Sequence, residues 1–342
     1  MTFLATIFWS ALGIFSASLC SGADIASQDT ATNPEFIPIS ITWAWAGVSM
    51  VLLWKVRWLH LINAAPQQWR LNTNACALLV ACGILLSGIV GALALRVLGA
   101  NTEGPLPPFA LLVALVLGSL TTIVAFLMFS HFSNTMATNL PPQQISAPIK
   151  TEIKTLNQGS ILETERLQSM PVSKRPIDSI AKLIALGVYG FLIVWPLVQM
   201  TSMFGGAIQF DFTGVRAPTL GHQFLETIRE QGNNPVTWGL VFTIVILGPL
   251  AEEIIWRGAV QQGLKQIGTP RAGAILITAS MFALFHWGAV PEYGRAAAIP
   301  ALAVFGVALG VLMERTGRLW SSFIAHALFN CANLFLFSML PK

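Results

Sequence analysis

The chain has 342 residues, of which 54% are hydrophobic and only 10% are charged, and its mean hydropathy is +0.68. Soluble globular proteins carry about 25% charged residues, so the composition excludes that class and indicates a membrane protein. The formal net charge is +4, and no dense run or stripe of Lys and Arg marks a nucleic-acid surface. We therefore expect the lipid bilayer as a partner and no nucleic acid.

The first apolar stretch, residues 3–20, fits two interpretations. Ser21-Gly-Ala23 resembles the small-residue site of a signal peptidase, but no Lys or Arg precedes the apolar run as a signal peptide would require. Residues 1–23 are therefore predicted to be either a cleaved signal peptide or a first membrane helix.

Further apolar segments follow along the rest of the chain. A helix that crosses a bilayer needs about 20 mostly apolar residues, and eight segments, some of them short, qualify. They are 37–54, 75–95, 108–130, 180–203, 237–258, 272–288, 296–313 and 319–339. This pattern predicts an all-α fold, a polytopic membrane helical bundle of about eight transmembrane helices plus the N-terminal signal peptide or extra helix.

A polar connection divides the predicted bundle into two regions. Residues 131–179 are rich in Pro, Gln, Ser, Thr and Lys, which is typical of a flexible linker. The linker separates an N-terminal membrane region of about three helices, 24–130, from a C-terminal membrane domain of about five helices, 180–342.

The distribution of basic residues predicts the orientation. If the spans alternate, the basic loops at 55–70, 131–179, 265–271 and 315–318 all fall on one side of the membrane. Loops rich in Lys and Arg face the cytoplasm. We therefore expect a multi-pass protein of the cell membrane whose four basic loops are cytoplasmic.

Two adjacent glutamates, Glu252 and Glu253, interrupt one apolar segment. Carboxylates inside a membrane segment are rare and usually functional. Glu253 precedes Arg257 by four residues, in the order that favours an ion pair on a helix, whereas Glu252 is rotated by about 100° and is left to face another helix. This geometry predicts that Glu253 and Arg257 form a structural brace and that Glu252 is a catalytic base.

Two histidines and an asparagine lie in later apolar segments. His286 ends the run that begins at Ser280, and His326 shares a helix face with Asn330 one turn away. Counted at 1.5 Å per residue, Glu252 and His286 lie about 20 Å from the cytoplasmic ends of their helices, but His326 lies only about 10 Å from its own. Taken singly, His286 and Asn330 also fit interhelical hydrogen bonds; taken jointly, the four residues predict one site.

Three motifs in this order carry a family resemblance. They are Glu-Glu-x-x-x-Arg at 252–257, Phe-x-x-x-His at 282–286 and His-x-x-x-Asn at 326–330. Together with their flanking sequences they resemble the CPBP family, which contains the type II CAAX prenyl endopeptidases and the bacteriocin-processing or immunity proteins. The resemblance covers about 180–340 and implies that this region is an intramembrane protease domain.

The resemblance also implies roles for the motif residues. An endopeptidase of this kind hydrolyses a peptide bond with a water activated by glutamate, so Glu252 would be the general base and His286 would hold and polarise the water. His326 and Asn330 would stabilise the oxyanion, as side-chain donors do in acyl transfer. The roles of Glu253 and Arg257 would be to orient the site, in a cavity that opens to the cytoplasmic side.

Three other functions remain open from the sequence. Glu252, His286 and His326 are the residues that would hold Zn²⁺ with a position left for water, but no His-Glu-x-x-His is present, so we expect no cofactor. A non-catalytic immunity or scaffold protein is the second alternative. An ion pathway is the third, although it would spread ionisable residues over more helices. The substrate is expected to be a peptide or membrane protein, and nothing in the sequence shows whether it is prenylated.

Overall fold

The computed structural model describes residues 71–100, 106–139, 180–217 and 231–338, with a few single positions at 44, 46–49, 51 and 228. All regular structure in these residues is helical, which confirms the predicted all-α class. Six of the described helices are long and apolar enough to cross a membrane. They are Thr73–Val97, Pro108–His131, Ile180–Thr213, Pro235–Gln266, Glu292–Thr316 and Leu319–Leu336.

Six of the eight predicted spans coincide with these helices, but the predicted number of about eight is not confirmed. The segment 272–288 forms a helix of only 15 residues, Arg271–Phe285, which is about 22 Å long against a hydrocarbon core of about 30 Å. The predicted span 37–54 lies mostly outside the described residues. The same holds for residues 1–23 and for most of the linker 131–179.

Glu252 and Glu253 lie on one long helix, Pro235–Gln266, which we call the glutamate helix. Asn234 caps its start by accepting a hydrogen bond from the Thr237 amide at 3.0 Å, and Pro235 occupies the first position, where its missing N–H is not needed. The helix passes through five segments. They are α9 (Pro235–Phe242), the π-helical η3 (Thr243–Leu247), α10 (Gly248–Glu253), the π-helical η4 (Ile254–Val260) and α11 (Gln261–Gln266).

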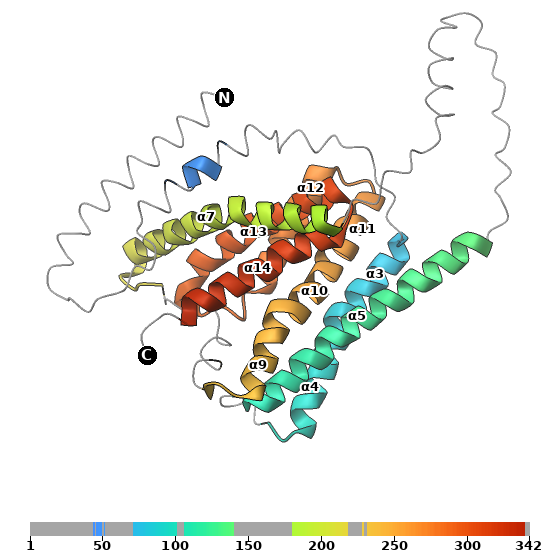
Figure 1. Ribbon diagram of the computed structural model, residues 1–342, viewed down its shortest axis with the longest axis horizontal. Helices are drawn as coiled ribbons and strands as arrows, with labels where there is room; N and C mark the ends of the chain where they lie inside the picture. The colour runs from blue at the N-terminus through green and yellow to red at the C-terminus, as the bar shows by residue number, and fades with distance from the viewer. Residues whose placement is uncertain are drawn as a thin grey trace, which may run out of the picture. The chain divides into compact units, whose positions relative to one another are not determined.

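The N-terminal helices lie along one side of the glutamate helix (Figure 1). The first is continuous through α3 (Thr73–Ala81), the π-helical η2 (Cys82–Leu86) and α4 (Ser87–Val97), and the second is α5 (Pro108–Asn139). Asn72 begins α3 by accepting a hydrogen bond from the Ala75 amide at 2.8 Å. α3 contacts η4 and α11, which follow Glu253, whereas α5 contacts segments on both sides of Glu253, from α9 to η4.

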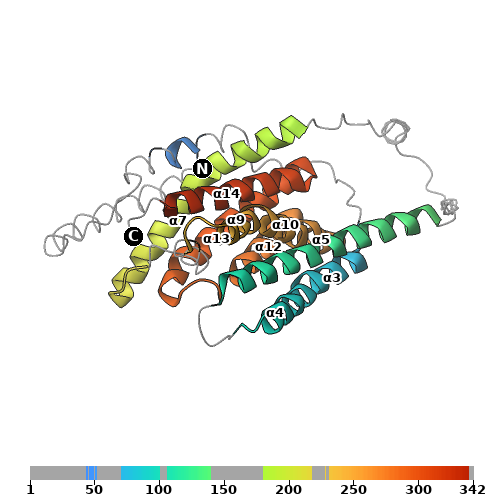
Figure 2. The ribbon, with the colours of Figure 1, turned by 60° about the horizontal axis from the view of Figure 1, so that its bottom comes forward.

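The C-terminal helices pack on the other side of the glutamate helix. They are α7 (Ile180–Thr213), α12 (Arg271–Phe285), α13 (Arg295–Thr316) and α14 (Leu319–Ser338), with the short η5 (Glu292–Gly294) before α13. Figure 2 shows α7 and α14 side by side, and Ser321 of α14 donates a hydrogen bond to the Leu183 carbonyl of α7 at 3.1 Å. Gly317, with φ of 59°, supplies the left-handed turn that ends α13.

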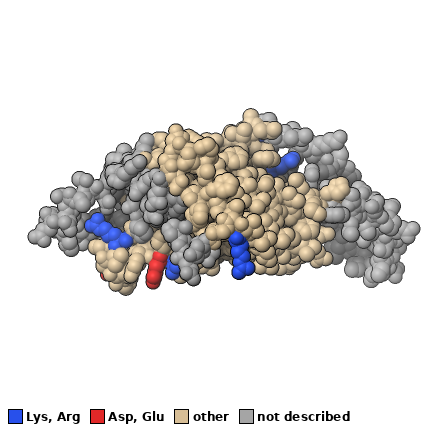
Figure 3. Space-filling view, turned by 90° about the horizontal axis from the view of Figure 1, so that it is seen from below, with Lys and Arg blue, Asp and Glu red and all other residues tan. Residues whose placement is uncertain are grey.

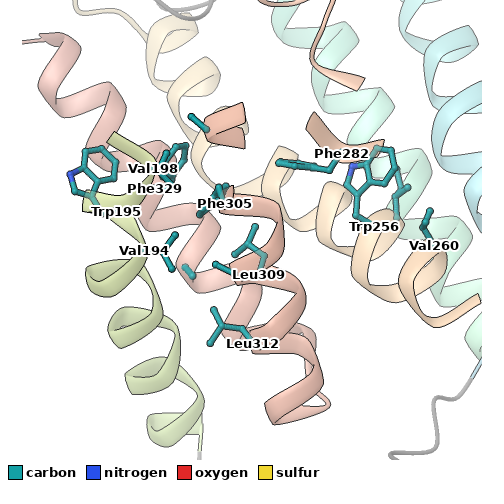
Figure 4. Packing of buried hydrophobic residues seen from close by; sticks show 14 residues of the cluster. Val194, Trp195, Val198, Trp256, Val260, Phe282, Phe305, Leu309, Leu312 and Phe329 are labelled. Carbon is teal, nitrogen blue, oxygen red and sulfur yellow. The ribbon is translucent and has the colours of Figure 1, made fainter. Parts of the chain in front are cut away.

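A buried apolar cluster joins these helices to the glutamate helix (Figure 4). It contains Trp195 of α7, Trp256 of η4, Phe282 of α12, Phe305 of α13 and Phe329 of α14. Most of the described surface seen in Figure 3 is uncharged, with a few separate basic and acidic side chains, as expected for helices in contact with lipid. The chain is a multi-pass membrane protein.

Candidate active site

The buried centre of the site is Glu253, whose side chain is completely inaccessible to solvent. Its Oε1 lies 3.2 Å from Nη1 of Arg257, one turn further along the helix, and 2.9 Å from Nδ1 of His326 on α14. Arg257 is also fully buried; it donates to the Gly306 carbonyl at 3.2 Å and its guanidinium lies 4.9 Å from the centre of the Phe282 ring. The brace predicted from the sequence is thus present as an ion pair, and it extends to α13.

His326 bridges the two glutamates. Its Nδ1 faces Oε1 of Glu253, while its Nε2 lies 3.7 Å from Oε2 of Glu252. A carboxylate paired with arginine only accepts hydrogen bonds, so the proton of this contact sits on Nδ1 of the imidazole. The Nε2 atom is therefore the part of the ring that is presented to Glu252.

Glu252 is the more open of the two glutamates. One third of its side chain is exposed, whereas that of Glu253 is not exposed at all. The 3.7 Å between Glu252 Oε2 and His326 Nε2 is too long for a direct hydrogen bond. The predicted difference between a braced and a more open carboxylate is therefore visible in the geometry.

His286 lies at the C-terminal end of α12 and is half-buried. The Phe282 carbonyl, one turn earlier, accepts a hydrogen bond from Nδ1 of His286 at 2.8 Å. A carbonyl has no proton to give, so Nδ1 carries the hydrogen and Nε2 of the neutral ring is left as an acceptor. Such an atom is suited to binding and polarising a water molecule.

Phe282 occupies the middle of the site, between the two histidines. Its ring is completely buried and meets His286 at 4.8 Å and His326 at 5.8 Å between ring centres. Trp256 contacts the same ring at 6.1 Å. Phe282 therefore separates the two histidines and excludes water from Arg257, a role that its spacing from His286 alone could not indicate.

Asn330 lies on the same helix as His326 but contacts a different part of the glutamate helix. Its Nδ2 donates to the Ile244 carbonyl at 2.9 Å, and Ile244 lies within the π-helical η3. An amide nitrogen carries two N–H groups, so this contact fixes the side chain while leaving one donor for another acceptor. The structure thus brings Glu252, Glu253, Arg257 and His326 into direct contact and anchors Asn330 to the same helix.

A second polar cluster, missed by the sequence reasoning, continues from the site to one end of the helices. Gln261, which is fully buried, donates to the Gly310 carbonyl at 3.1 Å and to Oε1 of Glu314 at 3.0 Å. Lys265 pairs with the same glutamate at 2.8 Å. The signal was available in the four-residue spacing, which continues from 253 and 257 to 261 and 265 on one helix face.

In the described part of the chain, no group of three or more His, Cys, Asp or Glu side chains is arranged to hold a metal ion.

The comparisons with known proteins identify the region that carries this site. A family model described as type II CAAX prenyl endopeptidase Rce1-like matches residues 234–332. No curated protein and no solved structure matches the chain significantly. The matched residues begin at the cap of the glutamate helix and include every site residue described above, whereas the N-terminal helices and α7 lie outside them.

Proposed function

Because the region 234–332 belongs to the Rce1-like family of type II CAAX prenyl endopeptidases, we propose that the chain is an intramembrane endopeptidase in which Glu252 activates the attacking water. The observation that carries the proposal is the unequal pair of carboxylates. Glu253 is neutralised by Arg257 at 3.2 Å. In the described residues no Lys or Arg forms an ion pair with Glu252, which faces Nε2 of His326 at 3.7 Å. A base must keep a free lone pair for the proton that it removes.

The proposed reaction is the addition of water to a peptide carbonyl. Glu252 takes one proton from the water while the water oxygen bonds to the carbonyl carbon. The other hydrogen stays on that oxygen and donates a hydrogen bond to Nε2 of His286. The carbonyl π-bond electrons move to the oxygen, which becomes an oxyanion. The C–N bond then breaks as Glu252 returns its proton to the departing amine, so that Glu252 ends as it began.

His326 and Asn330 are proposed to stabilise the oxyanion. Asn330 has one N–H free of its contact with the Ile244 carbonyl. His326 uses Nδ1 for Glu253, so it donates to the oxyanion through Nε2 only when the ring carries both protons. The Glu253 carboxylate stabilises that charged ring, as a buried carboxylate does for the histidine of a hydrolase triad.

Mutation of the proposed base tests this function. The purified protein would be incubated in detergent with a quenched peptide that ends in a farnesylated CAAX sequence, and with the unprenylated version of that peptide. Glu252→Gln and His286→Ala are expected to lower kcat at least 100-fold. Glu292→Gln, the same change at an exposed glutamate before α13, is the matched control and is expected to stay within twofold of wild type.

The same experiment separates the alternatives. Cleavage of the farnesylated peptide alone would assign a prenylated substrate, and cleavage of both would assign a more general peptidase. If the wild type cleaves a peptide and Glu252→Gln cleaves it equally well, the proposed base is wrong. If neither peptide is cleaved, mass spectrometry of membrane peptides that accumulate in cells carrying Glu252→Gln would find the natural substrate, and the absence of any such peptide would favour a non-catalytic role.

A further inference from the structure

The N-terminal helices contact the same segment that carries the proposed site residues. Leu71, Ala75, Cys76 and Leu79 of the α3 region are buried in one apolar cluster with Ile254 and Ala259 of η4. These two residues belong to the turns that also bear Glu253 and Arg257. The N-terminal helices lie outside the matched family region 234–332, so the family does not account for this packing.

The glutamate helix presents opposite sides to the two halves of the protein. Every fourth residue from Glu253 faces the C-terminal helices through polar contacts, as Arg257 does with Gly306 and Gln261 with Gly310. The other side approaches α3 and η2 very closely. An added Cβ at Gly263 would lie 3.3 Å from Cβ of Cys76, and one at Gly83 would lie 2.7 Å from Cγ1 of Ile255.

Polar contacts fix this packing at one end of the helix. Gln266, the last residue of α11, donates to the Leu71 carbonyl at 2.6 Å, and its side-chain oxygen accepts from Thr73 at 2.9 Å. Both partners lie at the start of α3. The register between α3 and the glutamate helix is therefore set by directional bonds as well as by apolar packing.

The segment held in this way is π-helical. π-Helical turns are rare and are frequently found at functional sites, and η4 extends over seven residues directly after Glu253. Ile255 of η4 packs in the site's apolar cluster together with Val80 and Ile84 of the first helix. Any shift of this helix relative to η4 thus changes the positions from which Glu252 and Arg257 reach their partners.

We propose that α3, η2 and α5 form a fixed positioning wall for the proposed peptidase site: they hold η4 in its π-helical register, and thereby set the direction of Glu252 relative to His326. This inference rests on the proposed function. It assigns the N-terminal helices to the catalytic unit, in which they stay docked throughout turnover. None of their residues touches the substrate; they act through η4.

Two substitutions on the same helix test the wall. Gly83→Leu places a side chain against Ile255, whereas Gly88→Leu makes the same change where nothing lies within 4 Å. With the farnesylated peptide as substrate, Gly83→Leu is expected to lower kcat at least tenfold with KM within twofold, because a misplacement of about 1 Å costs on the order of 100-fold in rate. Gly88→Leu is expected to keep both constants within twofold of wild type.

Hydrogen exchange supplies a measurement that does not depend on activity. The amides of 252–260 are expected to exchange at least tenfold faster in Gly83→Leu than in Gly88→Leu, while those of α13 are unchanged. Equal exchange in the two variants overturns the proposal even if no peptide is cleaved. A wild type without peptidase activity would count against the proposed function alone. If Gly83→Leu does not fold, the double variant Gly83→Ala with Ile255→Ala takes its place. The amides of 252–260 in this double variant are expected to exchange as they do in the wild type.

A disulfide tests whether the wall stays docked. Gly263→Cys places its Cβ 3.3 Å from that of the native Cys76, close to the separation of about 3.8 Å in disulfides. The oxidised variant is expected to keep at least half of the kcat of its reduced form. A loss of activity on oxidation that reduction restores would show that α3 moves during turnover, and would overturn the proposal.

Discussion

The buried ion pair of the site allows a quantitative prediction. Arg257→Met removes the partner of Glu253 at 3.2 Å, the hydrogen bond to the Gly306 carbonyl and the contact with the Phe282 ring at 4.9 Å. Breaking a fully buried pair on one side costs about 3–5 kcal/mol, because the remaining charge has no compensation. We expect Arg257→Met to lower the free energy of unfolding by that amount.

Replacing both members of the pair is expected to cost less than the two single changes together. Glu253→Gln keeps an oxygen that accepts from His326, and Arg257→Met fills the space of the arginine stem without a charge. The double variant leaves no unpaired charge, and contacting residues couple by about 0.5–3 kcal/mol. We expect its loss of stability to be at least about 2 kcal/mol smaller than the sum of the single losses, in line with apolar replacements of other buried pairs.

Reversible SDS denaturation in mixed micelles measures both quantities for the wild type, the two single variants and the double variant. Leu276→Ala, on the exposed side of α12, serves as the control for a change that touches no buried charge. The reasoning is refuted if Arg257→Met loses less than about 1 kcal/mol. It is also refuted if the double variant loses the full sum, since the two charges would then not compensate each other.

Three further predictions follow from the geometry. Peptidase activity is expected to be unchanged when a metal chelator is added. If the chelator abolishes activity and added Zn²⁺ restores it, the metal-free mechanism is wrong and a zinc-dependent mechanism takes its place. Gly205→Ala is expected to destabilise the protein by more than about 2 kcal/mol, because its Cβ would overlap the Ala296 carbonyl oxygen. The control Gly206→Ala meets only ordinary contacts beyond 3.5 Å and is expected to be neutral or stabilising. Equal unfolding curves for the two variants would contradict this prediction. In a variant without other reactive cysteines, Ile267→Cys is expected to react with a membrane-impermeant maleimide only from the cytoplasm and Phe212→Cys only from outside, and the reverse pattern would invert the orientation.

The sequence predicted the helices better than their lengths. Long apolar runs identified the described spans because lipid leaves a spanning backbone few alternatives to the helix. The ends were less accurate: α7 continues to Thr213 rather than 203, and the glutamate helix to Gln266 rather than 258. In both helices polar residues continue the last turns through side-chain hydrogen bonds, such as that of Gln261 with Glu314, so the apolar pattern ends before the helix does.

The pairing within the site was predictable only where it is local. The contact of Glu253 with Arg257 follows from their spacing of four residues. The contact of Glu253 with His326 spans 73 residues and depends on how α14 packs against the glutamate helix. Counting residues from the helix ends placed His326 about 10 Å nearer the cytoplasmic side than Glu252, yet the two side chains lie 3.7 Å apart, because that count ignores the relative shift and tilt of the two helices.

The adjacency of Glu252 and Glu253 is tolerable because the helix directs the two carboxylates to different surroundings. Neighbouring residues point about 100° apart, so Glu253 meets Arg257 and His326 in the protein interior while Glu252 keeps a third of its side chain exposed. If both glutamates served packing alone, a second cation or an amide would be expected beside Glu252. In the described residues the nearest charged or ionisable partner is instead a histidine nitrogen at 3.7 Å, already oriented by Glu253. Glu253 therefore orients the histidine that faces Glu252, and this arrangement supports the proposal that Glu252, rather than Glu253, is the base.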